Sequence, residues 1–180
     1  GFYAIVMSMN GRYESAAIAI FVAMILDGLD GRVARMTNTQ SDFGAEYDSL
    51  ADMVSFGLAP SILMYAWVLS SMGKVGWLVA FVYTAAAALR LARFNTQVGV
   101  ADKRFFQGLP SPTAAAILAG LVWVFEDYGL TATDVSWLIA GLALIIGVLM
   151  VSNVRYHSFK DLDLHGRVPF VMALVVVSVL

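Results

Sequence analysis

Apolar stretches of roughly helix length recur along the chain, and short polar segments separate them. About twenty consecutive apolar residues are enough for a helix to cross the hydrocarbon core of a membrane. Gly, Pro and Asn occur in most of the separating segments, as is typical where helices end. The pattern predicts helices over about 1–9, 13–36, 44–70, 76–95, 112–127, 135–153 and from 168 onward.

This series of helices predicts an all-α fold, a polytopic integral membrane helix bundle with six or more transmembrane helices, forming one transmembrane domain over 1–180. The first and last apolar stretches are each shorter than a membrane span, and the chain does not start with Met. We therefore expect a domain truncated at both ends, with about eight transmembrane helices in the full-length chain.

Composition supports a membrane protein and excludes several kinds of site. Of the 180 residues, 60% are hydrophobic and only 13% are charged, which is far from the average of soluble domains. The absence of cysteine excludes disulfides, zinc–thiolate sites and thiol nucleophiles. The formal net charge is −2 and no basic block occurs, so we expect no nucleic-acid partner.

Basic residues are distributed unevenly between the two predicted sides of the bundle. Nine of the 11 lie in or near the loops after the second, fourth and sixth helices, whereas only Arg12 and Lys74 lie on the opposite side. The nine are Arg32, Arg35, Arg90, Arg93, Lys103, Arg104, Arg155, Lys160 and Arg167. Cytoplasmic loops carry the excess of Lys and Arg. This predicts an integral membrane protein (of the inner membrane, if bacterial) with these loops, and any active site beside them, facing the cytoplasm.

Four aspartates stand out in the second and third predicted helices. Asp27 and Asp30 are three residues apart, and Asp48 and Asp52 are four apart, so each pair shares one face of a helix. Two such helices facing each other would bring the four carboxylates together. Their charges would repel one another in a membrane unless a cation compensated them. Because carboxylate oxygens suit hard divalent cations, the sequence predicts a metal and phosphate site.

The residues around these aspartates complete a pattern with eight fixed positions, Asp27-x2-Asp30-Gly31-x2-Ala34-Arg35-x8-Gly44-x3-Asp48-x3-Asp52. The pattern is similar, at every fixed position, to the signature of the CDP-alcohol phosphatidyltransferases, a family of integral membrane enzymes. The small residues leave room where helices and a nucleotide meet, and Arg35 suits phosphate oxygens.

The resemblance implies a role for each of these positions. A pair of divalent metal ions, Mg²⁺ or Mn²⁺, would be bound by Asp27, Asp30 and Asp48. Asp52 would complete this cluster and act as the general base. The cytidine nucleotide would be bound by Asp30, Gly31, Ala34, Arg35 and Gly44.

Further segments, at 48–60, 90–95 and 107–112, resemble those family members that use serine. That resemblance implies transfer of the phosphatidyl group of CDP-diacylglycerol to the hydroxyl of L-serine, with CMP as the other product. It also implies a homodimer among membrane lipids. Arg90, Arg93 and Asn95 are candidate acceptor-binding residues, because an arginine fork suits the serine carboxylate. The two arginines could equally contact lipid headgroups or the nucleotide phosphate.

Other functions remain open at this point. The same chemistry could use glycerol 3-phosphate, inositol phosphate, choline or ethanolamine as the acceptor. A membrane prenyltransferase also holds a diphosphate through metal, but would carry two well-separated Asp-rich motifs. A cation transporter could use the aspartates as an ion site, although it would be expected to show repeat symmetry, which this sequence lacks.

Overall fold

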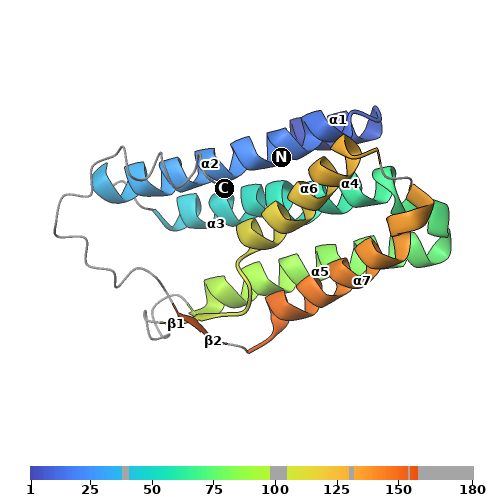
Figure 1. Cartoon of the computed structure of the whole chain (residues 1–180). Helices are drawn as coiled ribbons and strands as arrows, with labels where there is room; N and C mark the ends of the chain where they lie inside the picture. The colour runs from blue at the N-terminus through green and yellow to red at the C-terminus, as the bar shows by residue number, and fades with distance from the viewer. Residues whose placement is uncertain (38–40, 98–104, 130–131, 154, 158–180) are drawn as a thin grey trace.

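The computed structural model describes residues 1–37, 41–97, 105–129, 132–153 and 155–157 (Figure 1). The α-helices are α1 (Phe2–Met9), α2 (Tyr13–Thr37), α3 (Asp42–Asp52), α4 (Ala59–Trp67), α5 (Lys74–Gln97), α6 (Ser111–Asp127) and α7 (Ala132–Val151). A π-helical segment, η1 (Met53–Leu58), joins α3 to α4, and a short 3₁₀ helix, η2 (Leu69–Met72), precedes α5. Two short strands, β1 (Phe105–Gln107) and β2 (Arg155–His157), complete the chain.

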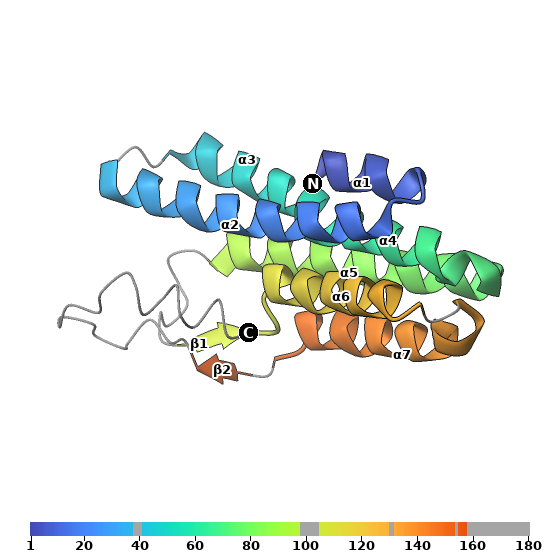
Figure 2. The same ribbon diagram turned by 45° about the horizontal axis from the view of Figure 1, so that its top comes forward.

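The helices lie lengthwise in one bundle (Figures 1 and 2). The most extensive pairings are α5 with α7 and α2 with α6, while α1 packs against both α2 and α4. Alanines fill many of these contacts, among them the fully buried Ala16, Ala17, Ala87, Ala115 and Ala119. Small side chains let helix backbones approach closely, which matters most where the surroundings are too apolar to drive helices together.

Within the part of the chain that the structure describes, two helical rods are long and apolar enough to cross a membrane, namely Phe43–Trp67 and Lys74–Thr96. The first of them runs through α3, η1 and α4 without interruption. Large apolar side chains also cover the outside of the bundle, with Trp137 73% exposed and Ile25 60% exposed. Such an exterior suits lipid rather than water, so the chain is an integral membrane protein.

The predicted helices agree closely with the observed ones. The second, predicted over 13–36, is Tyr13–Thr37, and the fourth, predicted over 76–95, is Lys74–Gln97. The third ends earlier than the predicted residue 70, because the backbone leaves the α-helix after Trp67 and continues into η2. The last predicted helix, from 168 onward, lies outside the described residues.

One feature departs from the all-α prediction. Strands β1 and β2 form an antiparallel ribbon in which Phe105 pairs with His157. The ribbon forms because α5 and α7 pack side by side, so the segments beyond them emerge at the same end of the bundle (Figure 2). Just after β1, Gly108 adopts a φ of +78°, and a Cβ atom there would overlap the carbonyl oxygen of Met150. Only glycine fits this close turn.

Candidate active site

Helices α2 and α3 lie side by side and bring three of the predicted carboxylates together (Figure 2). One oxygen each from Asp27, Asp30 and Asp48 lies within 4.8 Å of the other two. The spacing argument explains this arrangement, since Asp27 and Asp30 share one face of α2 while Asp48 projects from the helix opposite.

Asp52 joins the same cluster from one turn further along the helix. Its carboxyl group lies next to that of Asp27, and it also interacts electrostatically with Arg90 of α5. Asp52 is half-buried, whereas Asp30 and Asp48 are exposed. It therefore stands between the acidic cluster on one side and a basic side chain on the other.

The cluster suits a hard cation by its chemistry. Each pair of ionised carboxylates at such separations repels by ~1–4 kcal/mol, depending on access to water. Among the described residues, no Lys or Arg side chain forms an ion pair with Asp27, Asp30 or Asp48 that would offset this repulsion. Oxygen ligands without a basic partner, open to solvent on one side, fit a divalent ion such as Mg²⁺.

The glycines of the pattern leave space around this cluster. A Cβ atom at Gly31 would meet no atom within 4 Å. At Gly44, it would lie 3.1 Å from the Ser41 hydroxyl, which caps α3 by accepting a 3.0 Å hydrogen bond from the Gly44 amide. Ala34 and Arg35 belong to α2, but their side chains lie outside the described part of the structure.

The π-helical segment η1 begins directly after Asp52. Its wider turn leaves a backbone carbonyl, that of Phe56, which accepts a 3.0 Å hydrogen bond from the buried Tyr83 hydroxyl of α5. Single π-turns of this kind are frequent at functional sites. Here the turn ties the end of the acid-bearing helix to α5.

The two candidate acceptor-binding arginines have different surroundings. The Nη1 atom of Arg90 donates a 3.0 Å hydrogen bond to the Ser111 hydroxyl, whereas its Nε is buried and has no partner among the described residues. The Nη1 atom of Arg93 donates to the Val151 carbonyl oxygen (2.8 Å) and to the Asn153 side chain (3.2 Å). Arg93 thus holds the end of α7, while Arg90 keeps one buried donor without a partner among the described residues.

Asn95, the third candidate, connects α5 to α3. Its Oδ1 accepts a 3.1 Å hydrogen bond from Ser49, and its Nδ2 donates a 3.3 Å hydrogen bond to Glu46. The sequence analysis missed Ser49 and Ser111, although the position of Ser49, one helical turn before Asp52, could have indicated it. These contacts join the polar end of α5 to α3.

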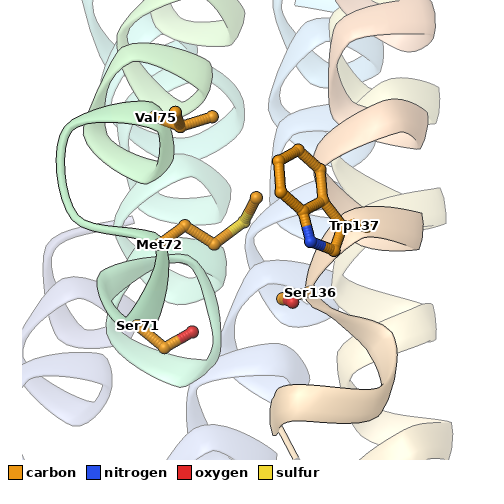
Figure 3. Close-up of a pocket in the computed structure, with 5 residues that line it drawn as sticks. All are labelled: Ser71, Met72, Val75, Ser136 and Trp137. Carbon is orange, nitrogen blue, oxygen red and sulfur yellow. The ribbon is translucent and has the colours of Figure 1, made fainter.

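Two cavities lie away from the aspartates. One, of about 310 Å³, is lined by Ser71, Met72, Val75, Ser136 and Trp137, where η2 and the start of α5 meet α7 (Figure 3). The other is an apolar groove of about 490 Å³ along α1 and α2 that reaches Leu26, the residue before Asp27. The acidic cluster is itself an open site between helices.

Comparison with known proteins identifies the class of enzyme that carries such a site. The family model described as CDP-alcohol phosphatidyltransferase matches residues 1–151, which is most of the chain. The chain belongs to this family, and it is therefore a transferase.

Several curated relatives within the family share one name, CDP-diacylglycerol–serine O-phosphatidyltransferase. The relative from Helicobacter pylori strain J99 is 39% identical over 178 residues, covering 99% of this chain and 75% of the relative. That from Methanocaldococcus jannaschii is 39% identical over 142 residues, or 79% of this chain and 63% of the relative. The Bacillus subtilis relative is 35% identical over 160 residues, or 89% of this chain and 84% of the relative. The resemblance to serine-using members is confirmed.

Proposed function

We propose that the protein transfers the phosphatidyl group of CDP-diacylglycerol to the hydroxyl of L-serine, giving phosphatidylserine and CMP. The observation that carries this proposal is the position of Asp52, which touches Asp27 of the acidic cluster and faces Arg90 of α5. A lipid-borne diphosphate and a small alcohol must meet at one point, and Asp52 borders both neighbourhoods. The names of the relatives support serine as that alcohol.

The metal site consists of Asp27, Asp30 and Asp48, with Asp52 completing it. We assign it to Mg²⁺ or Mn²⁺, bound as two ions, because all the ligands are carboxylate oxygens. When bound, the metal neutralises charge on the diphosphate and on the departing CMP. The protein's part is to hold these ligands on two helices whose acidic side chains converge.

The nucleotide lies over the small residues that follow the first aspartates. The open space at Gly31 supports this placement, since any larger side chain would project into it. Asp30, Gly31, Ala34, Arg35 and Gly44 form the CDP-binding set.

Asp52 is the general base. It accepts the proton of the serine hydroxyl while that oxygen forms a bond to the β-phosphorus of CDP-diacylglycerol, and the bond from phosphorus to the CMP oxygen breaks. Asp52 lies at the edge of the acidic cluster and beside Arg90 of α5, so it is the carboxylate of the four that also borders the proposed acceptor side.

The acceptor binds on the α5 side of Asp52, among Arg90, Arg93 and Asn95. Arg90 is the leading candidate for the serine carboxylate, because its Nε has no partner among the described residues. Arg93 contributes through its hold on α7, and Asn95 through its contacts with α3.

The enzyme is placed in the membrane with this site toward the cytoplasm, where the basic loops lie. There it meets its lipid substrate in the bilayer, in the inner membrane if the source is bacterial. We further propose a single transmembrane domain with six or more transmembrane helices. A homodimer is the proposed assembly.

A CMP-release assay tests the function directly. Purified protein in detergent or liposomes is given CDP-diacylglycerol, Mg²⁺ or Mn²⁺, and one of L-serine, glycerol 3-phosphate, inositol phosphate, choline or ethanolamine. We expect release with serine and formation of phosphatidylserine. Release only with another acceptor would retain the chemistry and reject serine. No release with any acceptor, together with metal-dependent ion flux in liposomes, would favour a cation transporter instead.

A further inference from the structure

A hydrogen-bonded chain links α3 to the end of α5 beside Asp52. Ser49 donates to Oδ1 of Asn95 at 3.1 Å, and Nδ2 of Asn95 donates to Oε2 of Glu46 at 3.3 Å. Because both ends of the Asn95 amide are engaged, its orientation is set, and with it the position of the Glu46 carboxylate. Glu46 is exposed, and Ser49 and Asn95 are half-buried.

Glu46 carries a charge that the protein does not neutralise. It belongs to α3 but lies outside the group formed by Asp27, Asp30 and Asp48. Within the described residues, its partner is the neutral Asn95 amide, and no Lys, Arg or His side chain pairs with it. A fixed carboxylate without a basic partner is suited to bind a cationic group, such as a primary ammonium.

Arg90 of α5, by contrast, is suited to bind an anionic group. Ser111 fixes its Nη1, and its Nε is buried and unpartnered among the described residues. A guanidinium in this state lacks an acceptor, and a carboxylate supplies one. Glu46 and Arg90 thus offer two opposite charges on α3 and α5, and Asp52, also of α3, lies within electrostatic reach of Arg90.

We infer that Glu46, positioned by Asn95, binds the ammonium group of the acceptor, while Arg90 binds its carboxylate and Asp52 faces its hydroxyl. This inference rests on the proposed function and adds to it the feature that the enzyme recognises, a zwitterionic amino-acid alcohol. The Glu46 charge also disfavours acceptors that carry a phosphate and no ammonium, such as glycerol 3-phosphate. Ser49 and Asn95 are positioning residues in this scheme.

Three acceptors distinguish recognition of the ammonium group from recognition of the carboxylate group. L-Serine carries both, ethanolamine lacks the carboxylate, and glycerate carries the carboxylate and a primary hydroxyl but no ammonium. CMP release is measured with each acceptor for the wild type, Glu46→Gln, Asn95→Ala and the control Glu14→Gln, which removes an exposed charge in the first turn of α2. The KM for CDP-diacylglycerol, measured in parallel, reports whether each variant is folded.

We expect Glu46→Gln to raise the KM for serine about 10-fold or more, because a charge-assisted hydrogen bond is lost. The KM for CDP-diacylglycerol should stay within about twofold of the wild type, since Glu46 lies outside the metal and nucleotide set. The preference for serine over glycerate should fall in the same proportion, and Glu46→Asp should restore part of it. Asn95→Ala should also raise the KM for serine and lower the preference for serine over glycerate, but by smaller factors than Glu46→Gln. Glu14→Gln should behave as the wild type.

Two failures are distinguishable. If the wild type releases no CMP with serine, the proposed function itself is wrong. If the wild type uses serine, but Glu46→Gln keeps both its KM for serine and its preference over glycerate, only the role of Glu46 is overturned. An equal loss with serine and glycerate in Glu46→Gln would likewise overturn it, because glycerate has no ammonium to bind.

Discussion

Asp52 separates two polar neighbourhoods that are organised in opposite ways. On the α2 side, Asp27, Asp30 and Asp48 face one another without a basic partner among the described residues. On the α5 side, hydrogen bonds already fix the side chains, as those from Arg90 to Ser111 and from Asn95 to Glu46 show. The first neighbourhood needs a bound cation to be stable, whereas the second is set before any ligand arrives. This difference fits the proposed division, with metal-dependent binding on one side and acceptor selectivity on the other.

Removing the proposed base, Asp52, should have the largest effect. Asp52→Asn should lower the rate of CMP release by about 100- to 10,000-fold, because the amide cannot accept the serine proton. Binding of CDP in the presence of Mg²⁺, measured by thermal shift, should be largely retained. Asp127→Asn, which changes an exposed aspartate at the end of α6, is the control. Near-normal turnover in Asp52→Asn would remove Asp52 as the base.

Breaking the metal side should come next. Asp27→Asn should lower activity at least about 100-fold at low Mg²⁺ concentration. It should also weaken the binding of Mg²⁺, since a charged ligand is lost from the cluster. Raising the Mg²⁺ concentration should recover part of the activity. Chelation of divalent ions should abolish activity in the wild type, and added Mg²⁺ or Mn²⁺ should restore it. Full activity of the wild type in excess chelator would contradict a metal site here.

Two matched substitutions on α5 sharpen the assignment of the selectivity side. Arg90→Lys should raise the KM for serine about 10-fold, because lysine cannot reproduce the planar guanidinium contact. Arg93→Lys should mainly lower thermal stability, as its hydrogen bonds to Val151 and Asn153 weaken. Kinetics and melting curves of both variants test this division. If Arg93→Lys alone raised the KM for serine, the roles of the two arginines would have to be exchanged.

The smallest effect is expected from loss of the buried hydrogen bond between the Tyr83 hydroxyl and the Phe56 carbonyl. Tyr83→Phe removes the hydrogen bond to the Phe56 carbonyl and should cost about 1 kcal/mol of stability. For a chain of this size, the melting temperature should fall by about 2–4 °C. A several-fold loss of turnover should accompany it if the π-helical segment positions Asp52. An unchanged melting temperature would show that this hydrogen bond contributes nothing net.

The sequence predicted the acid-bearing side well because that side depends on local spacing. Asp27 and Asp30 share a face by helical geometry alone, and their approach to Asp48 needs only that α2 and α3 be neighbours along the chain. The bounds of α2 and α5 were also predictable from apolar runs ended by polar residues.

The selectivity side was less predictable because its contacts span long stretches of sequence. Ser49 meets Asn95 across 46 residues, and Arg93 reaches Asn153 across 60. No local pattern encodes such pairings, which arise from how α5 packs against α3 and α7. The β1–β2 ribbon was missed for the same reason. Its strands are three residues each and pair only because their helices bring them together.

The π-helical segment after Asp52 has a consequence for the register of the whole rod. A π-turn holds about one residue more than an α-turn, and one residue corresponds to a rotation of about 100° around the helix axis. The acids of α3 can therefore point toward α2 while Leu63 and Met64 of α4 remain fully buried. Shortening η1 by one residue would give a more regular helix, yet would swing Asp48 and Asp52 away from Asp27 or expose the core. Because of this irregular turn, the acids before it can face α2 while the apolar residues after it face the core, although both belong to one continuous helical rod.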